Sequence, residues 1–196
     1  MKIIGVTGGV GAGKSTVLNY LKEKHNAYII QADLVGHDVM DPGGCCYDDV
    51  VALFGKEIIN NDKTIDRKQV SDIVFGNELM RQSLDAIIHP AVKQYIQHDI
   101  EKQRRNGCRL LVLEAALFFE EEYEKFCDTV WYIHTDSKVR ISRLMQNRGY
   151  SEEKSISIIN KQASEDFFRE HSDYTIVNNG DLSVTYSQVE EGINLL

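Results

Sequence analysis

The chain has 196 residues, of which 27% are charged and 42% are hydrophobic, and its formal net charge is −8. This length is sufficient for one well-buried core with room for an inserted subdomain. The acidic balance disfavours a nucleic-acid partner, because binding a phosphate backbone needs a concentrated basic surface. No apolar stretch approaches the roughly 20 residues of a membrane span, and the short N-terminal apolar run does not resemble a signal peptide.

Five apolar segments predict the strands of a parallel sheet: residues 2–7, 27–31, 109–114, 129–134 and 174–177. Their apolar residues are nearly continuous rather than alternating, which is typical of strands buried on both faces. Helical patterns, beginning with residues 15–24, separate the strands along the chain. This alternation predicts an α/β fold with a layered, five-stranded parallel sheet and right-handed crossovers.

Two stretches interrupt the alternation. Residues 38–101 contain no convincing strand and predict a helical insertion, in which Pro90 is expected to kink or break a long helix that starts near Asn77. Residues 141–168 contain a helix, a turn at Arg148–Gly149 and a further helix that begins after Ser151. The remaining segments, 1–37, 102–140 and 169–196, would form the core.

Residues 8–15, GGVGAGKS, match the phosphate-loop pattern G-x-x-x-x-G-K-[ST] between a predicted strand and a predicted helix. Glycines allow successive backbone N–H groups to turn inward around a phosphate, and the N-terminus of the next helix adds partial positive charge. Lys14 is expected to reach the β- and γ-phosphates, and the Ser15 hydroxyl to bind Mg²⁺. The stretch therefore predicts a nucleoside-triphosphate site of the P-loop NTPase type.

A phosphate loop does not identify the reaction. Two classes remain, a small-molecule kinase and a regulatory GTPase or other nucleotide-driven switch. A GTPase is expected to carry a guanine-reading N-K-x-D string, which does not occur in the chain. The two helical insertions favour a kinase, because one can hold the acceptor and the other can close over ATP and exclude water.

Acidic and basic residues accompany the predicted strand ends and insertions. Asp33 follows the second strand, where it would act either as a general base or as the N-cap of the next helix. Glu114 ends the third strand, the place where P-loop proteins hold an acid near Mg²⁺. Arg143 and Arg148 lie in the second insertion and are either surface residues or partners of the transferring phosphoryl group.

Taken together, the sequence resembles the dephospho-coenzyme A kinase family along nearly its whole length. The segments that carry the resemblance are VTGGVGAGKST, IIQADLVGHDVMDPG, IIHPAV, LVLEAALFFE, RLMQNRGYSEE and DYTIVNNGDL, in this order. The resemblance implies transfer of the γ-phosphate of ATP to the ribose 3′-hydroxyl of dephospho-coenzyme A, with Mg²⁺ as cofactor. It also implies that residues 38–101 form the acceptor subdomain and residues 141–168 a lid.

The resemblance also assigns roles to single residues. Asp33 matches the catalytic carboxylate and, with His89, would contact the acceptor. ATP would be bound by Gly9, Gly11, Ala12, Gly13, Lys14, Ser15 and Thr16, and near the adenine by Asn178, Asn179 and Gly180. Catalysis would further involve Lys14, Arg143 and Arg148, and the metal would be held by Ser15 and Glu114.

The chain departs from the family pattern in four places. Gln31 stands where an acid is common, Glu114 replaces an Asp, and Ala116 replaces a proline. Asn147 precedes Arg148 where the family often has Arg-Asp, so either Arg143 or Arg148 would contact the phosphate. Another P-loop kinase of the nucleoside monophosphate kinase type remains the alternative.

The four cysteines include no C-x-x-C pair, which indicates reduced thiols. We therefore expect a cytoplasmic protein, and we expect it to be a monomer without a nucleic-acid or membrane partner.

Overall fold

The computed structural model describes residues 1–196 and divides them into two compact units. The first unit contains Met1–Ile30 and Arg104–Leu196, and the second contains Gln31–Gln103. The functional division of the chain into core, acceptor subdomain and lid stays a prediction. None of the helices combines the length and the apolar character that crossing a membrane requires.

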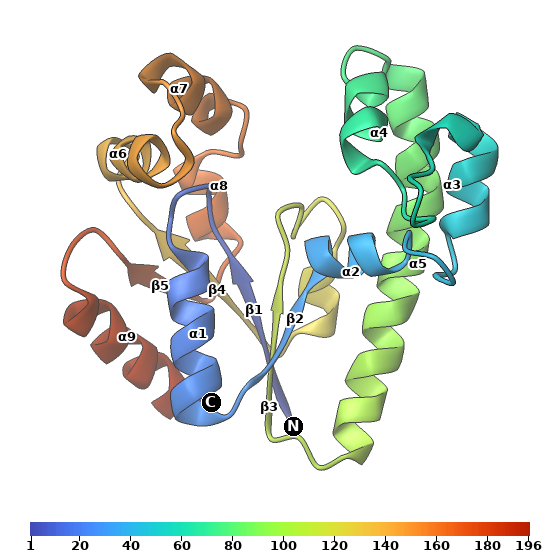
Figure 1. The fold of residues 1–196 in the computed structure, drawn as a ribbon. Coiled ribbons are helices and arrows are strands. Elements are labelled where there is room, and N and C mark those ends of the chain that lie inside the picture. The colour runs from blue at the N-terminus through green and yellow to red at the C-terminus, as the bar shows by residue number, and fades with distance from the viewer. The chain divides into compact units, whose positions relative to one another are not determined.

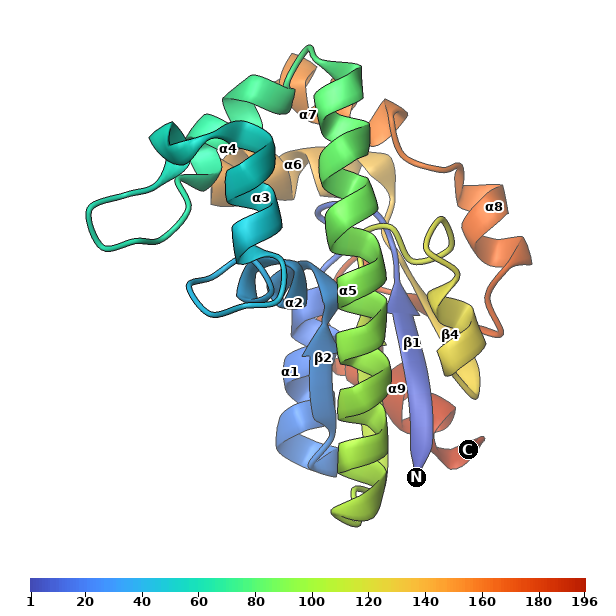
Figure 2. The same cartoon turned by 90° about the vertical axis from the view of Figure 1, so that its right-hand side faces the viewer.

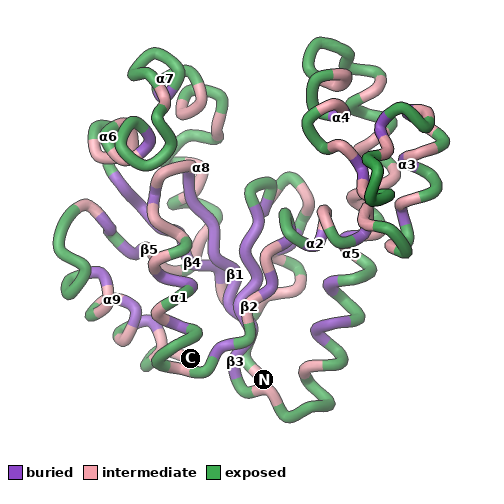
Figure 3. The backbone as a smooth tube through the Cα atoms, in the orientation of Figure 1, coloured by how far each residue is buried: buried purple, intermediate pink, exposed green.

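A five-stranded sheet has the order β2-β3-β1-β4-β5 (Figure 1). Its strands are β1 (Lys2–Thr7), β2 (Tyr28–Gln31), β3 (Leu110–Glu114), β4 (Thr129–His134) and β5 (Tyr174–Val177). The central strand β1 pairs in parallel with β3 and β4, and β4 pairs in parallel with β5. These strands confirm the predicted parallel α/β sheet, and Figure 3 shows that buried residues are concentrated in them.

The first unit contains the helices α1 (Lys14–His25), α6 (Ser137–Arg148), α7 (Glu152–Asn160), α8 (Glu165–Glu170) and α9 (Leu182–Asn194). A short 3-10 turn, η2 (Tyr123–Phe126), follows β3. One face of the sheet packs against α1 and α9, because Trp131 of β4 shares a buried apolar cluster with Leu21 and Val189. On the other face, Tyr132 stacks on Phe168 of α8 with ring centroids 5.2 Å apart.

The second unit contains α2 (Ala32–Asp38), α3 (Tyr47–Phe54), the 3-10 turn η1 (Lys56–Ile58) and α4 (Arg67–Val74). It continues into the long helix α5 (Glu78–Arg105). The only extended pairing of the insertion is an isolated antiparallel bridge between Ile59 and Ile65. The insertion is therefore helical, as its sequence predicts.

The prediction that Pro90 breaks its helix is wrong, because α5 is one helix of 28 residues with Pro90 inside it (Figure 2). Proline removes a single N–H donor from the helical ladder, and its penalty is local. Val92, Ile96 and Ile100 are buried at spacings of four residues beyond the proline. Their burial favours continuation of the helix and outweighs the lost hydrogen bond.

The segment after β4 follows its sequence signals closely. Gly149 ends α6 in the left-handed conformation, with φ 63°, where residues without a Cβ are favoured. The Ser151 side chain then accepts a hydrogen bond from the Lys154 N–H and caps α7. The predicted turn and the predicted helix start are both confirmed.

Candidate active site

The glycine loop, residues 8–13, joins the end of β1 to the start of α1 and lies beside α6 (Figure 1). Its shape depends on glycine at Gly13, which has φ 86° and caps α1. A Cβ at Gly13 would lie 2.2 Å from the Asn178 Nδ2 atom, so a side chain there would collide with the loop after β5. A Cβ at Gly9 would likewise lie 2.2 Å from a guanidinium nitrogen of Arg140. Gly13 is therefore required by its positive φ and by a buried neighbour, whereas a side chain at Gly9 would require the Arg140 guanidinium to shift.

Lys14 and Glu114, predicted from separate parts of the sequence, lie together. The Lys14 ammonium donates to the Gly8 carbonyl at 2.9 Å and lies 3.5 Å from Glu114 Oε1. Glu114 is the last residue of β3 and is buried. A buried carboxylate is costly unless it is paired, and the Lys14 ammonium offsets part of that cost.

Ser15 lies in the first turn of α1, exposed, and its hydroxyl makes no hydrogen bond within the chain. Its hydroxyl and the Glu114 carboxylate are hard oxygen donors, the type that Mg²⁺ prefers. No group of three or more His, Cys, Asp or Glu side chains in the described chain is arranged to hold a metal ion. This donor set fits Mg²⁺, which usually takes one or two protein ligands and completes its shell with water and phosphate oxygens.

The two arginines that the sequence leaves open have different surroundings. The Arg143 guanidinium donates to the Asn178 carbonyl at 2.9 Å and lies 3.4 Å from the Ala12 carbonyl. Arg148 is the last residue of α6, is exposed, and makes no hydrogen bond or ion pair with the described chain. Arg143 is therefore held by backbone oxygens, whereas Arg148 is available for a ligand.

The predicted Asn-Asn-Gly segment lies against the glycine loop. The Asn178 amide donates to the Ala12 carbonyl at 2.8 Å, and this side chain is almost fully buried. Asn179 Oδ1 accepts a hydrogen bond from the Asp136 N–H at 2.8 Å, just before α6 begins. Gly180 is exposed and has open space around it. The structure thus joins residues 12 and 178, which are far apart in the sequence.

Two predicted residues lie in the second unit. Asp33 is the second residue of α2 and is exposed, while the residue before the helix is Gln31, so the interpretation of Asp33 as an N-cap is wrong. His89 lies on α5, with its Nε2 atom 3.6 Å from Asp85 Oδ1, and Asp85 also pairs with Arg81 at 2.7 Å.

A second group of contacts, not predicted from the sequence, holds the tip of the glycine loop. The Arg140 Nε–H donates to the Val10 carbonyl at 2.9 Å, and its guanidinium also donates to Gln162 Oε1. The same Gln162 oxygen accepts the Val10 N–H at 3.0 Å. Burial lowers the pKa of Arg140 from its ordinary value, since both of its partners are neutral oxygens. The spacing of Arg140 and Arg143 indicates a shared helix face, but nothing in the sequence marks Gln162.

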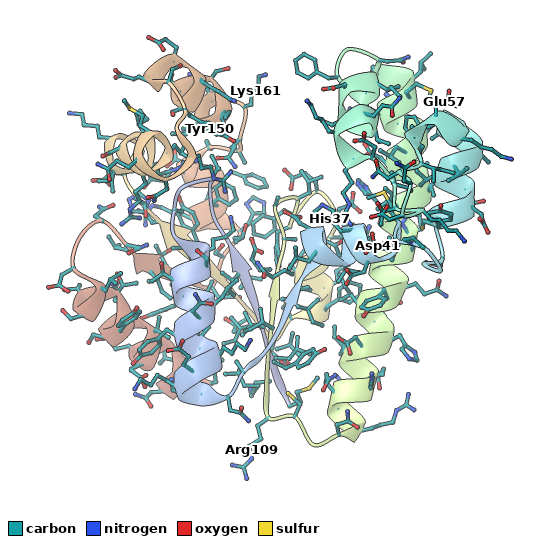
Figure 4. The ribbon with its side chains drawn as sticks, viewed as in Figure 1. His37, Asp41, Glu57, Arg109, Tyr150 and Lys161 are labelled. Atoms are coloured by element: carbon teal, nitrogen blue, oxygen red, sulfur yellow. The ribbon has the colours of Figure 1, made fainter.

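The segment around α7 is mostly solvent-facing. Tyr150 and Lys161, labelled in Figure 4, mark its two ends. The Lys154 ammonium lies over the Tyr150 ring, 4.1 Å from its centroid. Beyond α7, Phe167 packs edge-on against Phe119 with centroids 5.5 Å apart. Gln162, which follows α7, connects this segment to the glycine loop.

Comparison with known proteins identifies the family of the chain. The family model for dephospho-CoA kinase matches residues 2–183. A dephospho-CoA kinase of Oceanobacillus iheyensis is 36% identical over 96% of this chain and 94% of its own length. The dephospho-CoA kinase of Shouchella clausii is 33% identical over 97% of this chain and 96% of its own length.

Solved structures share the fold. A Thermus thermophilus protein matches with a TM-score of 0.83 at 23% identity, covering 100% of this chain and 97% of its own. The dephospho-CoA kinase of Campylobacter jejuni has a TM-score of 0.74 at 24% identity, covering 99% and 96%. A shikimate kinase of Bacteroides thetaiotaomicron, at 0.58 and 16%, covers 99% and 97% and shares the P-loop kinase architecture. The family match over residues 2–183 and the similarity to both curated kinases show that the chain belongs to the dephospho-CoA kinase family.

Proposed function

We propose that the protein transfers the γ-phosphate of ATP to the ribose 3′-hydroxyl of dephospho-coenzyme A, giving coenzyme A and ADP, the last step of coenzyme A synthesis. The observation that carries this proposal is the family match over residues 2–183, which includes the glycine loop with its Lys14–Glu114 pair. Kinase activity of this type needs a phosphate site, an acceptor base and a source of positive charge, and the chain supplies candidates for each.

The nucleotide would bind at the glycine loop. Backbone N–H groups of Gly11, Gly13 and Lys14 would surround the phosphates, aided by the partial positive charge of α1. The Lys14 ammonium, now bonded to the Gly8 carbonyl, would turn to the β- and γ-phosphate oxygens. Residues 178–180 would border the adenine, consistent with the bond between Asn178 and Ala12.

Asp33 is our candidate for the general base. As the ribose 3′-oxygen forms its bond to the γ-phosphorus, the bond between that phosphorus and the oxygen of ADP breaks, and the hydroxyl proton passes to the Asp33 carboxylate. We assign His89 to contact with the acceptor rather than to the chemistry.

Ser15 and Glu114 would hold Mg²⁺, which neutralises negative charge on the β- and γ-phosphates when it is bound. Arg148 would stabilise the charge of the transferring phosphoryl group, because it is the exposed arginine of α6 without a partner in the chain. Arg143 would instead contribute to ATP binding through its bonds to the Ala12 and Asn178 carbonyls. The expectations of a cytoplasmic monomer without a nucleic-acid partner stay predictions.

Two rivals make different predictions. A kinase of the nucleoside monophosphate kinase type has the same parts but a nucleotide acceptor. One sequence feature fits a GTP-dependent switch: residues 33–36 read D-L-V-G and thus match the D-x-x-G string of GTPases. The case against a GTPase therefore rests on the missing N-K-x-D string and on the family match.

An acceptor panel tests the proposal. ADP release from MgATP is measured with dephospho-coenzyme A, adenosine, AMP, CMP and shikimate, and the product is located by phosphorus NMR. We expect turnover with dephospho-coenzyme A alone, giving a 3′-phosphomonoester. Activity confined to a nucleoside monophosphate would refute the substrate, and acceptor-independent hydrolysis with a preference for GTP would refute the kinase.

The same assay tests the base. Asp33→Asn should lower kcat by about 10²–10⁴-fold with little change in ATP affinity. Asp38→Asn, at the exposed end of the same helix, is the matched control and should retain activity. Near-normal turnover of Asp33→Asn would remove Asp33 from the role of base.

A further inference from the structure

Three backbone carbonyl oxygens converge on the hydroxyl of Thr135, a buried residue that directly follows β4. The Thr135 Oγ1 atom lies 3.0 Å from the Ala12 oxygen, 2.9 Å from its neighbour's oxygen at His134 and 3.0 Å from the Asn178 oxygen. These oxygens belong to the glycine loop, the end of β4 and the loop after β5. The Thr135 side chain therefore contacts the glycine loop and two segments beside it, the end of β4 and the loop after β5.

A hydroxyl group has one proton, so it can satisfy only one of these oxygens at a time. Each of the three has a further donor. The Ala12 oxygen accepts from the Asn178 amide at 2.8 Å, and the His134 oxygen accepts from the Asn178 N–H at 2.8 Å. The Asn178 oxygen accepts from Arg143 at 2.9 Å. The network is thus complete, which is the condition under which buried polar groups rigidify a site.

Two neighbours fix the orientation of this network. Thr185 donates its hydroxyl proton to Asn178 Oδ1 at 3.1 Å, so the Nδ2 side of that amide must face Ala12. One Arg143 Nη atom lies 3.5 Å from Thr135 Oγ1 and 3.4 Å from the Ala12 oxygen. A cation therefore lies among the carbonyl oxygens and offsets their mutual repulsion.

The position of the Ala12 oxygen determines the direction of the next N–H group. In a trans peptide the C=O and N–H bonds point in opposite directions, and the chain contains no cis peptide. Holding the Ala12 oxygen in the network therefore turns the Gly13 N–H to the other side of the loop. That N–H makes no hydrogen bond within the chain and stands at the start of α1, where an anion is favoured.

We infer that Thr135 is a positioning residue for the nucleotide: its hydroxyl ties the loop after β5 to the glycine loop and so aims the Gly13 N–H at the phosphates of ATP. The inference rests on the proposed function only in that the loop binds a nucleoside triphosphate. Without the hydroxyl, the Ala12 oxygen keeps only the Asn178 amide and the more distant Arg143 guanidinium as donors, and the phosphate site is less well preorganised. Neither of the residues proposed to contact the acceptor, Asp33 and His89, belongs to this network.

The test compares Thr135→Val, which has the same shape without the hydroxyl, with Thr135→Ser, which keeps it. Affinities for MgATP, MgADP and inorganic tripolyphosphate are measured by calorimetry without acceptor. We expect Thr135→Val to bind ATP and tripolyphosphate about tenfold more weakly, and Thr135→Ser to stay within about threefold of wild type. Thr129→Val, at the opposite end of β4, is the control and should bind normally.

Kinetics and NMR separate positioning from general stability. The KM for ATP should rise in Thr135→Val while the KM for the acceptor is unchanged, and the Gly13 amide resonance should lose part of its shift on adding tripolyphosphate. Equal losses in the Val and Ser variants, or a lower Tm with wild-type ATP affinity, would overturn the inference. If Thr135→Val does not fold, Thr135→Ala provides the same deletion with less bulk. Normal ATP binding without turnover of dephospho-coenzyme A would refute the substrate and leave this test intact.

Discussion

The glycine loop and the predicted lid, residues 141–168, differ in how far along the chain most of their hydrogen-bond partners lie. Hydrogen bonds fix the loop to distant parts of the chain: Val10 to Gln162, across 152 positions, and Ala12 to Thr135 and Asn178, across 123 and 166 positions. A loop bonded in this manner cannot move without breaking several contacts at once. It is therefore preorganised for the charge that it would bind.

Arg143, Gln162 and Phe168 tie the predicted lid to the rest of the first unit, but its other hydrogen bonds are local. Gln146 donates to Ser142, and the backbone N–H groups of Lys154 and Phe167 donate to the caps Ser151 and Ser164. Contacts between residues three or four positions apart survive when a segment moves as a body. We predict that the part of this segment between these anchors, around α7, changes position on binding, as enzymes that exclude water require.

The largest effect is expected at the rigid end of this comparison. Lys14→Ala removes the ammonium that pairs with Glu114, and kcat/KM should fall by about 10²–10³-fold through loss of transition-state charge stabilisation. The control is Arg109→Ala, because Arg109 extends away from the start of β3 (Figure 4). Steady-state assays over a range of ATP concentrations check the result. Unchanged kcat/KM would contradict the assignment of the phosphate loop.

Two of the three arginines of α6, Arg143 and Arg148, test the boundary between the regions. Arg148→Ala should lower kcat by about 10–100-fold with an unchanged Tm, because the exposed side chain makes no hydrogen bond or ion pair within the chain. Arg143→Ala should instead lower both the Tm and the ATP affinity, because it removes a charged donor that the Asn178 and Ala12 carbonyls share. Paired kinetics and thermal denaturation distinguish them. A kcat loss in Arg143→Ala at normal Tm and ATP affinity would reverse the two roles.

Much of the fold could be predicted because its signals are local. Each strand is a short apolar run, and the five predicted runs agree with β1–β5 to within one residue at each end. The phosphate loop is equally local, since eight consecutive residues and their strand–helix context define it. Pro90 shows the limit of such reasoning: the proline penalty is read from the sequence, but the burial of Val92 and Ile96 that overrides it is not.

The site was only partly predictable for the same reason. Lys14 and Glu114 occupy positions that the sequence marks, and they lie 3.5 Å apart in the structure. Thr135 and Gln162 lie in no motif. Each contacts the glycine loop across more than a hundred positions of sequence, Thr135 at Ala12 and Gln162 at Val10. Contacts between residues so far apart in the sequence can be found only in the tertiary structure.

A smaller effect is expected where the two regions meet. Gln162→Leu keeps the size of the side chain but removes the oxygen that accepts from both Val10 and Arg140. Loss of this acceptor beside a half-buried cation should reduce the free energy of unfolding by about 1–2 kcal/mol and speed hydrogen exchange at Val10. Gln146→Leu, whose amide bonds only to Ser142 on the same helix, is the matched control. Equal exchange in both variants would show that the loop tip does not depend on Gln162.

The smallest effect tests whether the rigidity of the loop extends along α1. Tyr20 and His25 lie in the C-terminal half of α1 and contact Glu190 of α9. Glu190 Oε1 accepts from the Tyr20 hydroxyl at 2.8 Å and lies 2.9 Å from His25 Nε2. The Tyr20 hydrogen bond, followed by the His25 contact, lowers the pKa of Glu190 from its ordinary value. A carboxyl group with a lowered folded-state pKa stabilises the fold above its unfolded pKa, near pH 4.3, and that contribution is lost as the pH falls through the folded value.

Glu190→Gln should therefore lower the Tm by about 1–2 °C at pH 7, and the difference from wild type should shrink as the pH is lowered through 4. Thermal denaturation at several pH values measures this, and Glu191→Gln, next to it on α9, serves as the control. The ATP affinity of Glu190→Gln should equal that of wild type, because the Ala12 network and not the far end of α1 holds the glycine loop. A weaker ATP affinity in this variant would mean that contacts at the far end of α1 also affect the phosphate site. The rigid region would then include the whole of α1 and not the glycine loop alone.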